Sequence, residues 1–234
     1  MGTAGASAVT RAGVRARCAQ VAFTFVFQAL VLFGGAGRLG WVWAWVYLGL
    51  CALSFAVNAT LLLRHGADLV AERGHLGGMR RWDRWISLGS SLASWVALPL
   101  VAALDERCGW TAMAAGWHLL GAAVLVAASA LSGWAMHANA FFSSAVRIQT
   151  ERGHTVCRTG PYRFVRHPGY VGFILLWLAT AVLLGSLWAL VPAAVAGGFL
   201  VVRAAFEDRT LRAELPGYAE YAAEVRWGLV PGIW

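Results

Sequence analysis

Residues 160–170 read Gly160-Pro161-Tyr162-Arg163-Phe164-Val165-Arg166-His167-Pro168-Gly169-Tyr170, and a charge-free apolar run continues to Val202 before Arg203 and Glu207. Charged and polar side chains are costly beside a membrane segment unless they bind something. The two prolines lack amide hydrogens and favour extended backbone before them, so the stretch predicts a shaped loop rather than one continuous helix. We interpret it as half of a binding site for a small molecule.

The composition indicates an integral membrane protein. Of the 234 residues, 59% are hydrophobic and only 13% are charged, which is more apolar surface than a soluble domain of this length can bury. The 19 basic residues are all arginine and lie between apolar runs. This placement is typical of topology signals and of contact with membrane lipids, so no nucleic-acid partner is expected. The four cysteines show no paired spacing, and neither a disulfide framework nor a metal site is expected.

The distances between charged residues predict the membrane spans. Residues 18–37, 39–63 and 85–104 contain 20, 25 and 20 uncharged residues, each enough for one helical crossing of about 30 Å of hydrocarbon. A fourth span is predicted at about 110–136, because residues 139–144 are too polar to need lipid. The sequence therefore places four spans in residues 1–136.

The run 167–202 predicts two further spans. Its 36 uncharged residues correspond to about 54 Å of helix, too long for one crossing and enough for two short ones. Gly185-Ser186 is the predicted turn, and Pro192 is predicted to be a tolerated kink. The fold class is thus an all-α integral membrane protein with about six transmembrane helices, the last two forming a tight helical hairpin. The whole chain, 1–234, is predicted to be one membrane domain.

The arginine distribution predicts the orientation. In the six-span arrangement, 17 arginines lie on the side of the N-terminus, and only Arg38 and Arg107 lie on the other. The positive-inside rule then places both termini in the cytoplasm. A polar site can be assembled only from the cytoplasmic segments 64–84, 137–168 and 203–234.

Several polar features inside or between spans are predicted to be structural. Gly35-Ala36-Gly37-Arg38-Leu39-Gly40 matches a dinucleotide-binding pattern but follows a transmembrane run, so a short turn is expected. Gln28, Asn58 and His118 within spans are expected to form hydrogen bonds between helices.

Arg203 and Glu207 are four residues apart and share one helix face. Two interpretations stay open from the spacing alone. They pair with each other, or they belong to the site that the preceding loop begins.

A set of motifs in the last 100 residues resembles a known family, the isoprenylcysteine carboxyl methyltransferases, with phospholipid N-methyltransferases sharing much of the pattern. The motifs are, in order, His154-Thr155-Val156-Cys157, Gly160-Pro161-Tyr162, Arg166-His167-Pro168-Gly169-Tyr170, Arg203 with Glu207-Asp208, Leu215-Pro216-Gly217-Tyr218 with Tyr221, Val225-Arg226-Trp227 and Pro231-Gly232. The resemblance covers about residues 139–234.

The resemblance implies a membrane enzyme that binds S-adenosyl-L-methionine in a cytoplasmic pocket covered by the C-terminal segment, within a core of residues 137–234. Carried over by position, the cofactor-binding residues are Gln149, His154, Thr155, Val156, Cys157, Tyr162, His167, Pro168, Gly169, Tyr170 and Glu207. Arg203 is expected to face the substrate, and Arg203 with Glu207 to be catalytic. Asp208 departs from the family pattern, which usually has a second glutamate there, and this puts the detailed shape of the pocket in question.

The chemistry of these side chains agrees with that assignment. S-adenosylmethionine has a sulfonium, an ammonium and a carboxylate. Glu207 can bind the cationic groups, His167 or a nearby arginine the carboxylate, and Tyr162, Tyr170 or Trp227 can offer ring faces.

The expected reaction is carboxyl O-methylation of a prenylated cysteine or a similar isoprenoid acid. Arg203 can orient such a carboxylate through two hydrogen bonds. The alternatives left open are N-methylation of a phospholipid amine, with Glu207 as proton acceptor, and reduction of an enone lipid with NADPH. A non-enzymatic membrane protein is the remaining alternative.

Overall fold

The computed structural model describes residues 3–65 and 78–234, which are helical apart from their connecting segments. The long helices are α1 (Thr3–Ala36), α2 (Val42–His65), α4 (Arg81–Ser91), α5 (Leu98–Cys108), α6 (Ala115–Ala138), α7 (Pro168–Leu184) and α8 (Leu190–Glu214), and a short α9 (Tyr218–Glu224) follows. Each of the six predicted spans is helical. Within the described ranges, five helical segments have the length and apolar composition of a membrane span, and α7, with 17 residues, is a shorter apolar helix. The all-α membrane fold is confirmed.

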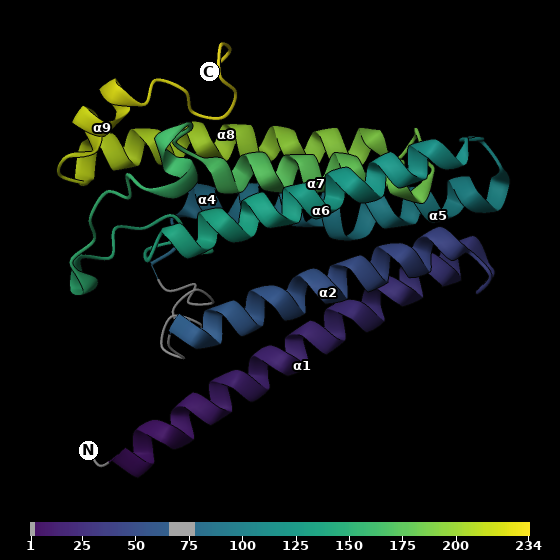
Figure 1. Cartoon of the computed structure of the whole chain (residues 1–234), viewed down its shortest axis with the longest axis horizontal. Helices are drawn as coiled ribbons and strands as arrows, with labels where there is room; N and C mark the ends of the chain where they lie inside the picture. Colours follow the sequence, from purple (N-terminus) through teal and green to yellow (C-terminus); the bar gives the residue numbers. More distant parts are fainter. Residues whose placement is uncertain (1–2, 66–77) are drawn as a thin grey trace.

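The helices run roughly along one axis, and the connections alternate between its two ends (Figure 1). Helices α6, α7 and α8 lie side by side, while α1 and α2 form a pair that lies along one side of the bundle and is inclined to it (Figure 1). The loop before α7 and helix α9 lie at one end, and the α5–α6 and α7–α8 turns lie at the other. Residues 66–77, part of the predicted connection between the second and third spans, fall outside the described residues.

The third span is one helical rod built from α4 and α5, with a π-helical stretch, Leu92–Ala97, between them. Gln28 of α1 donates a hydrogen bond from Nε2 to the Trp95 carbonyl in this stretch, 3.1 Å away. A π-helical turn often leaves its backbone open to a partner, and here α1 supplies one. The inter-helix role predicted for Gln28 is confirmed.

His118 and Asn58 behave differently from each other. His118 Nδ1 lies 2.8 Å from the Leu183 carbonyl and so joins α6 to α7, as predicted. Asn58 donates instead to the Ser54 carbonyl of its own helix, 2.9 Å away, which makes the predicted inter-helix hydrogen bond wrong.

The α7–α8 connection is the tight hairpin that the sequence predicts. Gly185 ends α7 with a φ of 81°, a left-handed conformation that favours glycine. The amide of Ser186 donates to the Ala181 carbonyl, 3.0 Å away, which completes the helix cap. Pro192 does not kink a span, because it occupies the first turn of α8, where a missing amide hydrogen costs no helical hydrogen bond.

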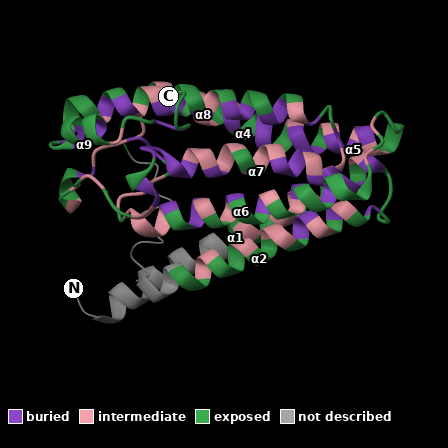
Figure 2. Cartoon of the chain, turned by 45° about the horizontal axis from the view of Figure 1, so that its top comes forward, coloured by how far each residue is buried: buried purple, intermediate pink, exposed green. Residues whose placement is uncertain are grey.

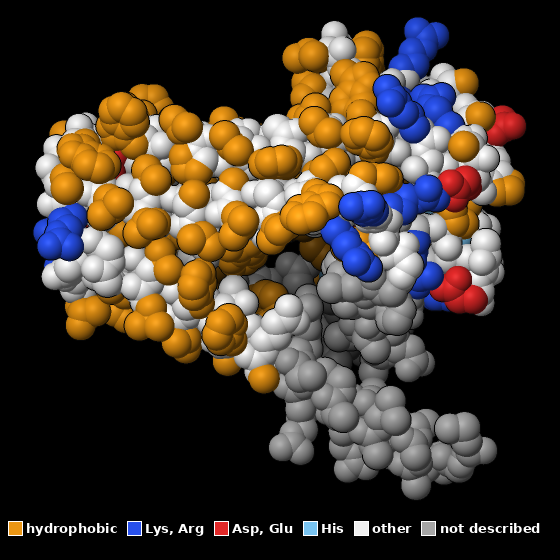
Figure 3. All heavy atoms as spheres, turned by 180° about the vertical axis from the view of Figure 1, so that it is seen from behind, with side chains coloured by type: hydrophobic (Ala, Val, Ile, Leu, Met, Phe, Trp, Pro, Cys, Tyr) orange, Lys and Arg blue, Asp and Glu red, His pale blue; other side chains and the backbone are white. Residues whose placement is uncertain are grey.

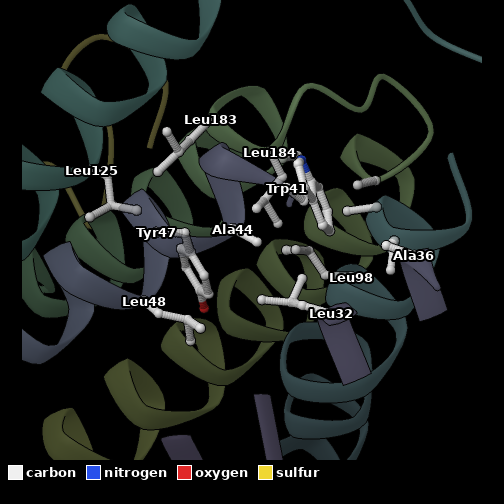
Figure 4. Packing of buried hydrophobic residues seen from close by; sticks show 14 of the residues in the cluster. Leu32, Ala36, Trp41, Ala44, Tyr47, Leu48, Leu98, Leu125, Leu183 and Leu184 are labelled. Carbon is white, nitrogen blue, oxygen red and sulfur yellow. The ribbon is translucent and has the colours of Figure 1, made fainter. Parts of the chain in front are cut away.

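The main apolar core lies where α1, α2, α5, α6 and α7 converge. Leu32, Ala44, Leu98 and Leu183 are at most 1% exposed there, and Figure 4 shows their side chains directed toward one another. Buried residues run along much of α7, whereas α2 is mostly exposed apart from the side facing the bundle (Figure 2). The second half of the chain is therefore the more completely packed half, and it surrounds α7.

The outer surface is divided by polarity. Seen from behind, hydrophobic side chains cover the flank of the bundle, while most of the arginine side chains in view gather at one end (Figure 3). Large apolar side chains such as Trp95, Trp117 and Trp188 are exposed. Such a surface is suited to a lipid environment along the flank and to a polar phase at the ends.

Candidate functional site

A pocket opens at the end of the bundle that contains the loop before α7. The space between its walls, open solvent included, is about 830 Å³. Nine of the twelve predicted site residues line it, namely His154, Thr155, Val156, Cys157, Tyr162, His167, Gly169, Tyr170 and Glu207. Residues far apart in the sequence thus meet around one space, as the predicted hairpin requires.

The loop that forms one wall has little regular structure. Between α6 and α7 it contains two short 3₁₀ turns, Thr150–Arg152 and Gly160–Arg163. Pro161 lies in the second turn, and Pro168 is the first residue of α7, where its missing amide hydrogen is harmless. The shaped loop predicted from the two prolines is confirmed.

Gln149 and Pro168 do not line the pocket, and Gln149 holds its wall in place. The buried Gln149 side chain donates from Nε2 to the Phe141 carbonyl at 2.8 Å and accepts a hydrogen bond from Arg152 Nη1 at 2.6 Å. These bonds tie two parts of the loop together. Cofactor contact by Gln149 and Pro168, as the family resemblance implies, therefore stays a prediction.

Glu207 contributes the carboxylate of the pocket. Its Oε2 accepts a hydrogen bond from the Tyr170 hydroxyl at 2.5 Å. Within the described parts of the chain, no arginine or histidine lies within ion-pair distance of Glu207. An acidic group in a partly enclosed pocket with no basic partner is suited to a cationic ligand.

Arg203 does not pair with Glu207, although both lie on one face of α8. Its Nε and Nη2 donate to the two carboxylate oxygens of the buried Asp83 in α4, at 2.7 and 3.2 Å. Nη2 also donates to the Ser144 carbonyl at 2.7 Å, and the guanidinium carbon lies 5.6 Å from the centre of the Tyr170 ring. Of the two interpretations left open by the spacing, pairing with Glu207 is wrong.

This arrangement limits what Arg203 can offer a substrate. The edge formed by Nε and Nη2 is already used by Asp83 and Ser144. Nη1 makes no hydrogen bond to the residues that the structure describes. Arg203 is also not among the residues that line the pocket, and the paired hydrogen bonds predicted for a substrate carboxylate do not fit this conformation.

Asp208 organises the neighbouring turn of α8. It accepts from Arg166 Nε at 2.8 Å, from the Tyr218 hydroxyl at 2.7 Å and from Arg212 Nε at 3.1 Å, and His167 Nε2 lies 3.4 Å away. Asp208 is not among the residues that line the pocket. The position at which the sequence departs from the family pattern therefore joins α8 to the loop and to α9.

The C-terminal segment is fastened to the same loop. Arg166 Nη1 donates to the Val225 and Arg226 carbonyls, at 2.8 and 2.6 Å. The backbone amides of Arg166 and His167 donate to the Trp227 and Gly228 carbonyls, each at 2.9 Å. The motif residues before α7 thus hold the end of the chain across this region. The Trp227 side chain lies in a separate surface depression with Phe164, so the predicted ring face from Trp227 is absent from the pocket.

His154 lies in the pocket wall as a neutral imidazole. Burial lowers its pKa below the ordinary 6.5; Glu207 opposes this, and Arg152 and Arg147 add to it. The Gln149 amide donates to His154 Nδ1 at 3.3 Å, and the ring stacks on Phe141 with 4.5 Å between ring centres. Since Nδ1 accepts, the imidazole proton lies on Nε2.

The tyrosines of the pocket are held in their neutral form. Burial is the main cause that raises the pKa of Tyr162, Tyr218 and Tyr221 well above the ordinary value. The Tyr221 hydroxyl donates to the Tyr162 carbonyl at 2.7 Å, which attaches α9 to the loop. These side chains supply ring faces and hydroxyl groups, not charge.

Several pocket residues were not identified from the sequence. Phe141, Phe142, Ile148, Leu211 and Leu215 add apolar lining, and Asn139 donates to the Tyr162 hydroxyl at 3.4 Å. Apolar residues beside a membrane span give no signal that separates a pocket lining from a lipid contact. Asp83, 120 positions before Arg203, was also missed because its place in an arginine-rich and tryptophan-rich segment is typical of an interfacial anchor.

Comparisons with known proteins agree with the motifs. Residues 120–213 match the model of the isoprenylcysteine carboxyl methyltransferase (ICMT) family. Two curated relatives, from Oryza sativa subsp. indica and subsp. japonica, are each described as a probable protein-S-isoprenylcysteine O-methyltransferase. Each is 36% identical over 90 residues, which is 38% of this chain and 47% of the relative. The chain thus spans about half the length of the curated relatives it matches. The resemblance read from the motifs is confirmed over residues 120–213, where the chain is similar to the isoprenylcysteine carboxyl methyltransferase family.

Proposed function

We propose that this protein is an S-adenosylmethionine-dependent methyltransferase that acts on a lipophilic carboxylate, with prenylated cysteine as the preferred acceptor. The family match over residues 120–213 and the names of the two relatives support the reaction class. The observation that carries the proposal is Glu207, a carboxylate without a basic partner among the described residues, in a pocket built by the same motifs.

The residues of the pocket fit this cofactor. Glu207 offers a negative charge to an ammonium or sulfonium group, and Tyr170 fixes the orientation of that carboxylate. Val156, Leu211 and Leu215 form an apolar lining suited to the flat face of an adenine. S-adenosylmethionine supplies a methyl group on a positively charged sulfur, from which an oxygen nucleophile can displace a neutral thioether.

In this proposal, the side chains contribute by positioning and by exclusion of water. A carboxylate acceptor is already a nucleophile near neutral pH, so no side chain has to remove a proton from it. Arg203 does not line the pocket, but its Nη1 has no hydrogen bond to the described residues and is the donor proposed to hold such an acceptor, while Asp83 and Ser144 keep the rest of the guanidinium fixed. Alignment of the two reactants in a site shielded from water is the main source of rate enhancement for a direct displacement.

The arginine distribution supports a cytoplasmic position for the pocket and for both termini. Arg38 and Arg107, at the α1–α2 connection and at the end of α5, belong to the end opposite the pocket. The loop before α7 carries five arginines between residues 147 and 166. Positive residues concentrate in cytoplasmic loops, so we assign the pocket end to the cytoplasm.

Calorimetric titration of the detergent-solubilised protein tests the cofactor. We expect heat of binding with S-adenosylmethionine and S-adenosylhomocysteine and none with NADPH. Binding of NADPH alone would indicate the reductase alternative, and absence of binding by all three would refute the enzyme class.

Labelled cofactor then tests the acceptor. The protein is incubated with radiolabelled S-adenosylmethionine and either farnesylated cysteine or phosphatidylethanolamine. We expect transfer to farnesylated cysteine as a base-labile ester. Base-stable label on the phospholipid would indicate the N-methyltransferase alternative.

A further inference from the structure

Asp83 is a fully buried carboxylate outside the motifs of the C-terminal region. It lies in the first turn of α4 and is 0% exposed. Oδ1 accepts from Arg203 Nε and from Ser87 Oγ, at 2.7 and 3.3 Å, and Oδ2 accepts from Arg203 Nη2 and from the Val146 amide, at 3.2 and 2.8 Å. A buried charge is tolerated when it is paired and hydrogen-bonded in this way.

Two carboxylates, those of Asp83 and Glu207, act on the Arg203 guanidinium around Tyr170. Glu207 is four residues after Arg203 on α8, a spacing at which side chains of opposite charge meet. Tyr170 touches both, because its ring lies under the Arg203 guanidinium and its hydroxyl donates to Glu207. Asp83 approaches from another helix and takes the Nε and Nη2 edge of Arg203.

The consequence for the pocket is a difference in net charge. Asp83 neutralises Arg203, and Glu207 is left without a basic partner in the described chain. If Arg203 turned to Glu207 instead, the pocket would lose the negative charge that suits a cationic ligand. We propose that Asp83 is a positioning residue that holds Arg203 away from Glu207, so that the Glu207 carboxylate stays available to a cationic cofactor.

This inference rests on the proposed function and deepens it, because it adds a residue of α4 to a site that the motifs place in residues 139–234. A positioning role and a merely structural role for the Asp83–Arg203 pair make different predictions. A structural tie between α4 and α8 predicts that any loss of the pair harms the site. A positioning role for Asp83 predicts instead that removal of Asp83 alone weakens cofactor binding more than removal of both partners. Only an Arg203 that has lost Asp83 can form an ion pair with Glu207 and block it.

The experiment compares five forms of the protein: wild type, Asp83→Asn, Asp83→Glu, the double variant Asp83→Asn with Arg203→Met, and Asp105→Asn. Calorimetry measures the Kd for S-adenosylhomocysteine, and a thermal melt without ligand reports folding. Asp105→Asn is the matched control, because Asp105 is also a buried carboxylate, 1% exposed, that bonds Thr111 and Ser186 at the opposite end of the bundle.

We expect Asp83→Asn to raise the Kd about tenfold or more, which corresponds to Arg203 occupying Glu207 in about nine of ten molecules. The double variant should return the Kd toward the wild-type value, and Asp105→Asn should leave the Kd unchanged even where it lowers the melting temperature. Asp83→Glu, which keeps the charge, should bind more tightly than Asp83→Asn. If Asp83→Asn does not fold, Asp83→Ser replaces it as a smaller neutral side chain, with the same expectation.

Three outcomes overturn the proposal. A wild-type Kd in folded Asp83→Asn means that Arg203 does not compete for Glu207. Equal loss in the single and double variants means that Asp83 acts through the fold alone. Absence of binding by the wild-type protein refutes the proposed function, and this inference with it, so the two failures are distinguished by the wild-type measurement.

Discussion

Arg166 and Asp208 join the two ends of the apolar hairpin, with Nε 2.8 Å from Oδ1 and Nη2 3.2 Å from Oδ2, although 42 residues separate them. Arg166 precedes α7 and Asp208 lies in the last part of α8. The Arg166 side chain is 3% exposed and that of Asp208 10% exposed. Because the same guanidinium also holds the Val225 and Arg226 carbonyls, the ion pair fixes the C-terminal segment as well as the hairpin.

Replacement of Arg166 by Met should lower the free energy of unfolding by at least about 2 kcal/mol, since a buried carboxylate loses its main partner. Hydrogen exchange of residues 225–234 should become faster. The control is Arg158→Met, because its ion pair with Glu224 is largely exposed and should contribute no more than about 1 kcal/mol. Equal effects of the two substitutions, measured by thermal melts in detergent, would contradict this account.

Replacement of Glu207 by Gln should weaken binding of S-adenosylmethionine and S-adenosylhomocysteine by about tenfold or more. The amide keeps an acceptor for Tyr170 but removes the negative charge, and a hydrogen bond to a charged group contributes about 1.5–3 kcal/mol. Titration calorimetry measures both affinities. Glu214→Gln, in the exposed ion pair with Arg80 outside the pocket lining, is the control and should bind normally. Unchanged affinity in Glu207→Gln would remove Glu207 from the site.

The His154 loop should lose stability as the pH falls. The pKa of His154 lies below 6.5 in the folded protein, so folding favours the neutral form. The stability that neutral His154 gives to the folded loop is fully present above about pH 6.5. It is lost progressively below that pH, because the unfolded chain binds the proton more readily than the folded one. Hydrogen exchange of residues 149–157 should therefore accelerate as the pH falls below about 6.5.

His154→Phe provides the comparison for this pH dependence. The substitution keeps an aromatic ring against Phe141 and cannot titrate. Its exchange rates, corrected for intrinsic chemistry, should not show the additional acceleration. If the wild-type protein and the variant respond identically to pH, His154 is not the titrating group.

Close packing of α6 on α7 should make Gly172 intolerant of a side chain. A Cβ at this position would collide with Ser132 Oγ and would lie 3.1 Å from the Ala128 carbonyl oxygen. We expect Gly172→Ala to destabilise the protein by about 1–3 kcal/mol. Gly198→Ala in α8, where a Cβ meets nothing within 4 Å, should be neutral or stabilising by up to about 1 kcal/mol. Thermal melts of the two variants give the comparison.

The orientation can be tested with two native cysteines at opposite ends. Cys108 is exposed at the end of α5, and Cys157 lines the pocket. In spheroplasts that contain single-cysteine variants, a membrane-impermeant maleimide should label Cys108 and should reach Cys157 only after permeabilisation. S-adenosylhomocysteine should then slow the labelling of Cys157. The reverse labelling pattern would invert the assigned topology.

Much of the fold was predictable because charge is so costly in lipid that uncharged runs mark the spans. The hairpin was predictable because Gly185 can adopt the left-handed conformation that a tight turn requires. The π-helical stretch in the third span was not, since it depends on the contact between Gln28 and the Trp95 carbonyl. Tertiary contacts of this kind leave no periodic signal in the sequence.

The candidate site was likewise predictable only in part. Short motifs identified His154, Tyr170 and Glu207, which line one pocket in the structure. The partner of Arg203 was not predictable, because spacing along α8 favours Glu207 and says nothing of Asp83 on a distant helix. Whether an arginine is free for a ligand depends on the carboxylates that reach it in three dimensions, and these come from the whole chain.

Helix α7 has 17 residues, which gives it a length of about 26 Å, less than the roughly 30 Å of hydrocarbon in a typical bilayer. Such hydrophobic mismatch is relieved when the bilayer thins locally or when flanking residues are drawn inward. Where flanking residues are drawn inward, the loop at the start of α7 comes to the depth at which headgroups meet acyl chains. For the proposed function, this would let a substrate keep its isoprenoid tail in the leaflet while its polar end enters the pocket, and the proposed catalysis should then depend on bilayer thickness.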